Sequence, residues 1–209
     1  MEIIAHRGYW IDKAEKNTFT AFKRAIDNNF GIETDLRDYD GEIVISHDIP
    51  TQNNRTLDDF LNLVSENKEI ILALNIKSDG LQDLLLRNDA IKEIRHFYFD
   101  MSIPDCLIFS KKNMTYFSRV SDIEPTALLY LESDGVWLDN FTDDELDLVE
   151  LDKVLSDGKK VALVSPELHG YCYESYWAKL KQYVLERKSS KNILICTDFP
   201  MQAKDYFNV

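Results

Sequence analysis

Short apolar runs recur along the chain, and longer segments with a helical spacing of apolar residues lie between them. Eight runs have the composition of β-strands, at residues 2–8, 31–37, 70–78, 96–102, 114–121, 135–141, 160–170 and 192–200. After the first run, Phe19, Phe22 and Ile26 follow one another at helical intervals, and similar segments cover 56–67, 103–113, 143–158 and 174–190. Strands that alternate with helices are typical of a parallel sheet with crossover helices.

Eight strands in this order predict a compact (β/α)8 TIM barrel that forms a single domain over residues 1–209. Residues 42–48 predict an additional strand or an extended loop attached to the second strand. Segment 123–133 leaves room for a helix of about two turns. At 56–67 the helix is expected to begin with Thr56 as its N-cap.

Polar residues stand at the end of every predicted strand, whereas the strand interiors are mostly apolar. In (β/α)8 enzymes the chemistry lies at the carboxyl ends of the strands, so we expect the site there. A charged residue at a single strand end is often an ordinary surface residue. The strand-end residues are His6, Arg7, Glu33, Asp35, Arg37, Asn75, Lys77, Asp100, Arg119, Asp139, Glu167, His169 and Asp198.

The second predicted strand carries Glu33, Asp35 and Arg37 at alternate positions. Side chains of a strand alternate between its faces, so these three charges are expected to share one face. Two carboxylates on one face can hold a hard divalent cation such as Mg²⁺ or Ca²⁺. The alternative is a salt bridge from these carboxylates to Arg7 or Arg37.

Two of the four histidines, His6 and His47, end β-like runs beside a polar residue. A histidine pair suits general acid–base catalysis because the imidazole pKa lies near neutrality. Arg7 and Lys77 would supply positive charge for a phosphate group.

The net charge and the cysteine positions disfavour some kinds of binding partner and of metal site. With 24 basic and 37 acidic residues the net charge is -13, which disfavours nucleic acid and anionic lipid as partners. Cys106, Cys172 and Cys196 show no CxxC spacing, so neither a zinc site nor a disulfide framework is indicated. The chain has no predicted signal peptide or membrane-spanning run, and we expect a cytoplasmic protein with no membrane insertion.

Several motifs, taken together, resemble the glycerophosphodiester phosphodiesterase family of the phospholipase C-like barrel phosphodiesterases. They are HRG at 6–8, EKNTFTAFKRAI at 15–26, GIETDLRDYDGEIVISHD at 31–48, NIK at 75–77 and TDFP at 197–200. The resemblance implies that His6 and His47 form the acid–base pair and that Arg7 contacts phosphate. It also implies that Glu33 and Asp35 hold a divalent metal.

The chain departs from the family pattern at three places. Lys16 replaces the glutamate of the family's PENT loop, so that only Asn17 and Thr18 carry over. Asn75 stands where the family has a third acidic metal ligand, which predicts weaker metal binding or a ligand borrowed from Asp48 or Asp100. The segment that the family commonly inserts after the HD motif is missing, so we expect a short variant with a more open mouth.

These observations predict a metal-dependent hydrolase that cleaves a small-molecule phosphodiester to an alcohol and a phosphomonoester. The nucleophile is either water or a neighbouring hydroxyl of the substrate. Glu167 and His169 are candidates for contacts with the substrate head group, or for capping and surface roles. The alternatives are a barrel that binds a phosphate ligand without turning it over and a lyase or isomerase that uses Lys77 as its amine. The substrate and the oligomeric state stay open.

Overall fold

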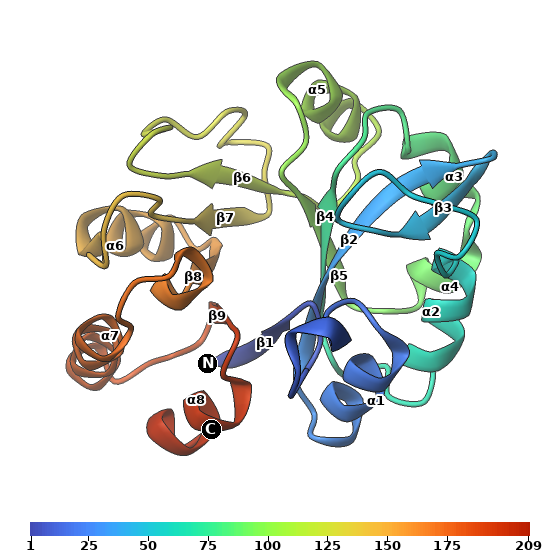
Figure 1. Ribbon diagram of the computed structural model, residues 1–209. Helices are drawn as coiled ribbons and strands as arrows, with labels where there is room; N and C mark the ends of the chain where they lie inside the picture. Colours follow the sequence, from blue (N-terminus) through green and yellow to red (C-terminus); the bar gives the residue numbers. More distant parts are fainter. The chain divides into compact units, whose positions relative to one another are not determined.

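Strands and helices alternate along the chain, all 209 residues of which are described by the computed structural model (Figure 1). The strands are β1 (Glu2–His6), β2 (Gly31–Tyr39), β3 (Glu42–Ile45), β4 (Leu72–Ile76), β5 (His96–Phe99), β6 (Phe117–Val120), β7 (Gly135–Leu138), β8 (Lys160–Val164) and β9 (Ile193–Thr197). The α-helices are α1 (Phe19–Asp27), α2 (Leu57–Val64), α3 (Gln82–Arg87), α4 (Asp89–Lys92), α5 (Ile103–Lys111), α6 (Leu148–Ser156), α7 (Glu174–Arg187) and α8 (Pro200–Phe207). Short 3-10 helices cover Lys13–Glu15 (η1) and Pro166–His169 (η2).

The chain divides into two compact units. The N-terminal unit comprises residues 4–116, and the C-terminal unit comprises residues 1–3 and 117–209. In the N-terminal unit the parallel strands are ordered β5-β4-β2-β1, and β3 pairs antiparallel with β2. In the C-terminal unit the parallel order is β9-β8-β7-β6. This order of strands and helices is that of a (β/α)8 barrel, which confirms the predicted fold class.

The strand β3 confirms the expectation of an additional strand after the second one, because Arg37 pairs with Val44 and Leu36 with Ile45. The connection between β6 and β7 leaves room for about two helical turns but contains no helix. Residues 123–133 form turns and no helix. Pro125 lies in this stretch, and the residue before a proline is pushed out of the helical region, which is a physical reason for the missing helix.

Helices of the N-terminal unit begin at side-chain caps and bury one face. Thr56 accepts a hydrogen bond from the amide of Asp59 at 3.1 Å, which confirms its predicted role as the N-cap of α2. In α1 the buried residues follow a helical spacing, and the ring of Phe22 packs against Phe60 of α2 at 4.7 Å between centroids. The two helices therefore pack against each other through aromatic side chains.

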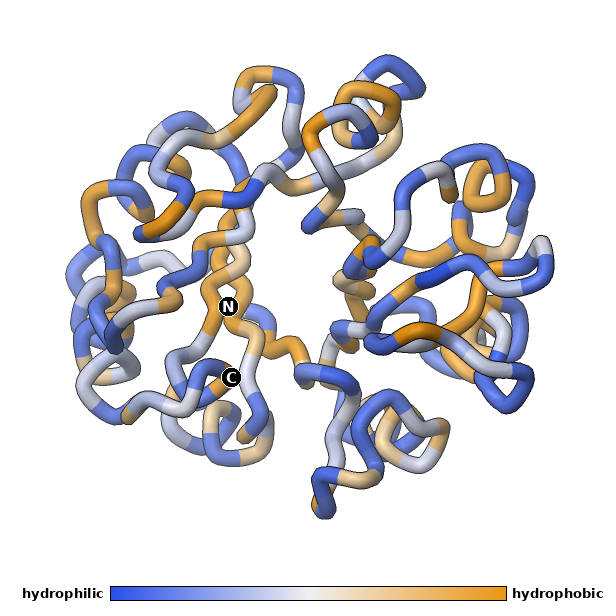
Figure 2. Tube along the Cα trace, turned by 45° about the horizontal axis from the view of Figure 1, so that its top comes forward, coloured by the Kyte–Doolittle hydropathy of each residue, from blue (hydrophilic) through white to orange (hydrophobic).

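The strands carry most of the apolar core. Ile4, Ile32, Leu72, Leu74 and Phe97 are fully buried on the parallel strands of the N-terminal unit. Figure 2 shows hydrophobic stretches along the strands and hydrophilic stretches at many of the outer turns. No helix of the protein is long and apolar enough to cross a membrane.

Candidate active site

Two carboxylates lie buried on β2 of the N-terminal unit. Glu33 is 2% exposed and Asp35 is fully buried. Because they are two residues apart on one strand, their side chains point to the same face. Glu33 pairs with His6 of β1, and Asp35 pairs with Asn75 of β4. The parallel ladders thus bring polar residues of three neighbouring strands to one end of the sheet.

The backbone after β1 turns toward Glu33. Arg7 is left-handed, with φ of 57°, and its amide donates to Glu33 Oε2 at 3.1 Å. His6 Nε2 lies 3.9 Å from the same oxygen. Burial raises the pKa of Glu33, and the charge of Asp35 raises it further, whereas the charges of Arg7 and Lys77 lower it. Glu33 therefore lies where a proton or a cation is favoured.

Cations and amides surround Asp35. Its Oδ2 accepts from Asn17 Nδ2 at 2.8 Å and lies 3.2 Å from Arg7 Nε. Its Oδ1 lies 3.5 Å from Lys77 Nζ. The oxygen of Asn17 accepts from Thr34 Oγ1 at 2.9 Å, so the amide is held in place from both sides. The salt bridge to Arg7, considered as an alternative to metal binding, is thus formed.

Buried oxygen atoms without donors mark the place where a cation fits. Asp35 Oδ1 and Asn75 Oδ1 are buried and accept no hydrogen bond. Asn75 Nδ2 donates to Asp100 Oδ2 at 3.3 Å, which makes Asp100 the acidic neighbour of Asn75. The side chain of Asp48 is instead 93% exposed. Histidine, cysteine, aspartate and glutamate alone do not form a metal-binding group of three or more, but the oxygens of Glu33, Asp35 and Asn75 suit Mg²⁺ or Ca²⁺.

The hairpin β2–β3 returns the chain to the carboxylates and presents His47. The amide of Ser46 donates to the carbonyl of Asp35 at 3.0 Å. His47 Nδ1 lies 2.8 Å from Asp48 Oδ1, and 44% of the His47 side chain is exposed. The hydrogen bond to His47 lowers the pKa of Asp48, and the charges of Arg7 and Arg37 lower it further. The His47 segment therefore lies within the electrostatic reach of Arg7.

Arg37 has a structural contact near the site. Its Nε donates to the carbonyl of His47 at 3.1 Å. Although Arg37 has the same parity as Glu33 and Asp35, it is only partly buried near the end of β2. It holds the returning segment beside the strand and forms no ion pair with the carboxylates in this arrangement.

The loop after β1 packs tightly against α1. Gly8 has φ of 85°, and a Cβ atom there would lie 2.9 Å from the backbone carbon of Ala21. The amide of Tyr9 donates to the carbonyl of Ala21 at 3.0 Å. Lys16, which replaces the glutamate of the family motif, lies over the ring of Trp10 with its Nζ 4.6 Å from the centroid.

Three solved structures with this architecture are described as phosphodiesterases. The chain superposes on a glycerophosphodiester phosphodiesterase from Parabacteroides distasonis with a TM-score of 0.68 and 18% identity, covering 99% of this chain and 96% of that one. A phosphodiesterase from Oleispira antarctica, in complex with the product sn-glycerol-3-phosphate, gives 0.69 and 16%, covering 100% and 97%. A glycerophosphodiester phosphodiesterase from Agrobacterium tumefaciens gives 0.64 and 14%, with full coverage of both chains. The chain therefore shares its fold with these three phosphodiesterases.

This likeness is one of structure. No protein-family model and no curated protein sequence matches the chain. Identities of 14–18% are low enough for the fold to persist while individual site residues change. The roles of the side chains therefore have to be argued from their own contacts.

Glu167 and His169, the remaining predicted site residues, lie in the C-terminal unit. Glu167 accepts hydrogen bonds from residues of the same unit. Its carboxylate accepts from Ser165 Oγ, from Thr197 Oγ1 and from the amide of Asp198 at 3.0 Å. Burial raises the pKa of Glu167, and the hydroxyl donors lower it. With its oxygens satisfied inside the unit, Glu167 ties the end of β8 to the end of β9.

His169 is the last residue of η2 in the same unit and pairs with an acid. Its Nε2 lies 2.8 Å from Asp139 Oδ1, and its ring lies 4.8 Å from that of Phe141 between centroids. The hydrogen bond to Asp139 raises the pKa of His169. This geometry supports an oriented, partly exposed imidazolium.

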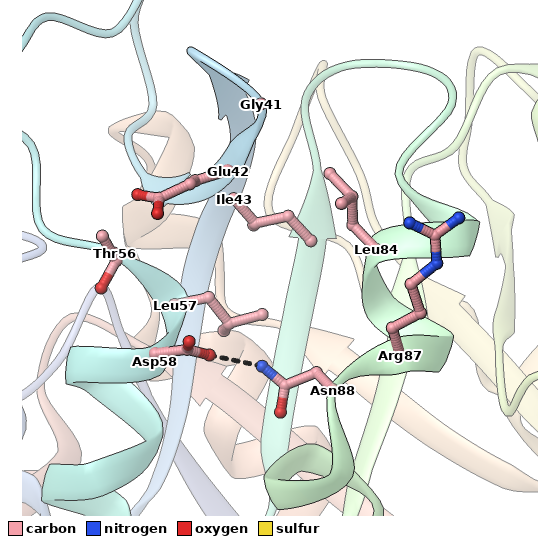
Figure 3. A pocket seen from close by; sticks show the side chains of 9 residues that line it. All are labelled: Gly41, Glu42, Ile43, Thr56, Leu57, Asp58, Leu84, Arg87 and Asn88. Atoms are coloured by element: carbon pink, nitrogen blue, oxygen red, sulfur yellow. Dashed lines mark hydrogen bonds between the residues drawn. The ribbon is translucent and has the colours of Figure 1, made fainter.

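The N-terminal unit also contains a hollow of about 270 Å³ that is separate from the predicted site residues (Figure 3). Ile43, Leu57 and Leu84 extend into it from β3, α2 and α3. At its side, Asn88 Nδ2 donates to Asp58 Oδ1 at 2.5 Å. None of the catalytic or metal-ligand candidates lines this hollow.

The sequence does not indicate two contacts of the site, that of Asn17 with Asp35 and that of Asn75 with Asp100. Asn17 was noted only as a motif position, whereas it links Asp35 to Thr34. Asp100 is one of the two acids from which the sequence predicts a borrowed ligand, and it accepts a hydrogen bond from Asn75. The sequence signal for Asp100 is its position directly after a strand. Asn75 pairs with Phe99 in the sheet, and Asp100 is the residue that follows Phe99.

Proposed function

We propose that the protein is a metal-dependent phosphodiesterase that cleaves a glycerophosphodiester to an alcohol and a phosphomonoester. The observation that carries the proposal is the buried pair Glu33 and Asp35, with His6, Arg7 and Lys77 placed around it. The fold supports it, since three solved structures with this fold are described as phosphodiesterases and one of them is in complex with the product sn-glycerol-3-phosphate.

Glu33, Asp35 and Asn75 would hold Mg²⁺ or Ca²⁺ through their oxygens, with Asp100 as the nearest further acid. A divalent cation there would neutralise charge that develops on the phosphoryl oxygens. Arg7 and Lys77 also lie against Asp35 and offset part of its buried negative charge. The same two side chains are available to bind phosphate oxygens.

His6 and His47 would divide the proton transfers between them. One imidazole removes the proton from an attacking water as its oxygen bonds to phosphorus. The other imidazolium donates its proton to the alcohol oxygen as the P–O bond breaks. If a neighbouring hydroxyl of the substrate attacks instead, the first product is a cyclic phosphate, which water then opens to the phosphomonoester. The Asp48 carboxylate, which lies 2.8 Å from His47 Nδ1, would orient that ring.

The test is hydrolysis of glycerophosphocholine and of a chromogenic phosphodiester with Mg²⁺ or Ca²⁺ present. His6→Ala and His47→Ala should each lower kcat by about 10²- to 10⁴-fold, the usual contribution of a general acid or base. His96→Ala is the matched control, because His96 lies at the start of β5 and its Nδ1 lies 2.9 Å from the carbonyl oxygen of Ile94, not from a candidate site residue. Full activity in both site variants would overturn the proposal.

A second function is favoured by one observation. Asp35 already has Arg7, Lys77 and Asn17 around it, and Asn75 brings no charge. Such a site could bind a phosphodiester without turning it over. Calorimetry separates the two functions: tight binding of glycerophosphocholine with no product after hours of incubation supports the binding protein and contradicts the enzyme.

A further inference from the structure

A hollow of about 360 Å³ lies within the C-terminal unit, where residues that follow β6 and β7 meet the first turns of α6 and α7. We call it the acidic hollow, because five of its twelve lining residues are acidic and none is basic. The five acids are Asp122, Asp139, Glu145, Asp147 and Glu150. The proposed function gives no role to any residue of this lining, so its charge needs a separate explanation.

Two of these acids, Asp122 and Asp147, bind backbone amides rather than cations. Asp122 Oδ1 accepts from the amide of Phe141 at 2.9 Å, which lowers the pKa of Asp122. Asp147 Oδ1 accepts from the amide of Glu150 at 2.9 Å and caps α6. Both glutamates of the lining, in contrast, pair with lysines. The two aspartates therefore bring exposed negative charge that no side-chain cation of the protein neutralises.

Two buried polar groups of the acidic hollow have unused hydrogen-bonding capacity. The side chain of Asp139 is 8% exposed, and its hydrogen bonds with His169 Nε2 and with the amide of Asn140, both at 2.8 Å, go to Oδ1, which leaves Oδ2 without a donor. Tyr176 is 3% exposed, and its hydroxyl has no hydrogen-bond partner. Burial raises the pKa of Tyr176, and the charge of Asp139 raises it further, so the hydroxyl keeps its proton. Buried polar atoms without partners are costly, and a ligand that meets both atoms would remove that cost.

Apolar side chains complete the lining and indicate the shape of the ligand. Val120, Leu138 and Leu146 are all buried and can pack against methylene groups. The acids do not converge on one point, because no three or more histidine, cysteine, aspartate or glutamate residues form a group that could hold a metal ion. An elongated organic cation therefore fits this lining better than a metal ion does.

We propose that the acidic hollow binds an aliphatic diamine or polyamine. One ammonium group donates to Asp139 Oδ2 and to the hydroxyl oxygen of Tyr176, and the methylene chain packs on the apolar side chains. The second ammonium group meets the exposed carboxylates of Asp122 and Asp147. The net charge of -13 raises the local concentration of such cations. This site does not depend on the phosphodiesterase activity, since it shares no residue with the machinery proposed for that reaction.

The first test is isothermal titration calorimetry of putrescine into the full-length protein at about 0.15 M NaCl, where distant charges are screened. Tyr176→Phe should raise the Kd by about tenfold, because it removes a hydrogen bond to a charged group. Tyr183→Phe is the matched control on the same helix, since its hydroxyl donates to Asp152 Oδ1 at 3.0 Å and does not line the hollow. Its Kd should equal that of the unaltered protein. An unchanged Kd in Tyr176→Phe overturns the proposal.

The second test asks whether the ligand is held at both ends. Asp147→Asn keeps the cap of α6, because asparagine caps helices as well as aspartate does, and removes one exposed charge. It should raise the Kd of putrescine by about threefold and leave that of n-butylamine unchanged. Equal affinities of the unaltered protein for putrescine and n-butylamine would contradict a site for diamines.

A proton NMR titration of the unaltered protein tests the site without any variant. An ammonium group bound at Asp139 disfavours the neighbouring imidazolium, so putrescine should lower the titration midpoint of His169. The midpoint of His96, which lies in the N-terminal unit, should not move. An unmoved His169 midpoint, or an equal shift with MgCl₂ at the same ionic strength, overturns the amine site.

Discussion

Asn17 organises the carboxylate cluster through one amide group. Its nitrogen donates to Asp35 and its oxygen accepts from Thr34, both of which are fully buried. Its backbone is left-handed, with φ of 59°, a conformation that asparagine tolerates better than most residues. The amide of Asn17 also donates to the carbonyl of Arg7 at 2.9 Å. One residue thus joins the loop after β1 to the middle of β2.

The residue scale also gives a prediction about pH, at His169 of the C-terminal unit. Its pKa is raised above 6.5 by the hydrogen bond to Asp139. Because the folded-state pKa exceeds the unfolded value, the contact stabilises the fold fully below the unfolded pKa, and this contribution is lost as the pH rises through the folded-state pKa. Asp139→Asn should therefore lower the free energy of unfolding more at about pH 5.5 than at about pH 9.

Two measurements check this prediction. Urea unfolding at several pH values gives the difference in free energy, and proton NMR gives the titration midpoints of the histidines. The midpoint of His169 should fall in Asp139→Asn, whereas that of His96, whose pKa burial lowers, should stay the same. An unchanged His169 midpoint would show that Asp139 does not hold the imidazolium.

Residue parity explains which parts of the site could be foreseen. Alternation along a strand places Glu33 and Asp35 together whatever the rest of the fold does, and the structure keeps them so. Alternation along the strand does not, however, indicate which hydrogen-bond or ion-pair partner each side chain meets. Arg37 shares the parity but donates to the carbonyl of His47. Which cation meets which carboxylate depends on loops such as the left-handed turn at Arg7, and no local pattern indicates that turn.

At the scale of elements, Gly8 controls how closely α1 approaches the loop that carries Arg7. Gly8→Ala adds a Cβ atom 2.9 Å from Ala21 in a left-handed backbone, so it should lower the free energy of unfolding by about 2–4 kcal/mol. Gly41→Ala is the matched control, because Gly41 has φ of 83° with nothing within 4 Å of the added Cβ. In Gly41→Ala the free energy of unfolding should fall by only about 1–2 kcal/mol, the cost of a left-handed backbone for alanine.

Urea unfolding of both glycine variants measures the difference. Equal losses would mean that the loop and α1 separate freely, and the close approach would then have no energetic consequence. A larger loss in Gly8→Ala together with a fall in phosphodiesterase activity would connect the packing of α1 to the position of Arg7.

Elements with strong local signals were predictable, and those without them were not. Thr56 before an apolar stripe predicts the start of α2, and the apolar run at 42–48 predicts an additional strand or an extended loop, of which the strand is observed. The helices α3, α4 and α8 are short, with at most eight residues, so they show little periodicity and depend on packing for their stability. Residues 123–133 form turns, and Pro125 is the local signal against a helix there.

At the scale of the whole molecule, the net charge of -13 predicts a dependence of stability on salt. Raising NaCl from about 0.01 M to 0.15 M shortens the Debye length from about 30 to 8 Å and should raise the Tm by a few degrees. MgCl₂ at matched ionic strength should raise it further, because a cation that binds only the folded protein adds its binding free energy.

The variant Glu33→Gln separates the two effects by differential scanning fluorimetry. It should keep the response to NaCl and lose the extra response to Mg²⁺, since one oxygen ligand loses its charge. If Mg²⁺ and NaCl act alike on the unaltered protein at equal ionic strength, the proposed metal site is wrong.

The loop that follows β3 has a further consequence for engineering. Its base is clamped, because the amide of Ile45 donates to the carbonyl of Arg55 at 2.8 Å and Asn54 Nδ2 donates to the carbonyl of Ile45 at 2.9 Å. Extra residues inserted between Pro50 and Asn53 would extend from this hydrogen-bonded base. Doubling the length of a loop costs only about 0.6 kcal/mol of closure entropy. The protein is thus a ready acceptor scaffold, on which lids taken from other barrels can be grafted and compared without altering the sheet beneath them.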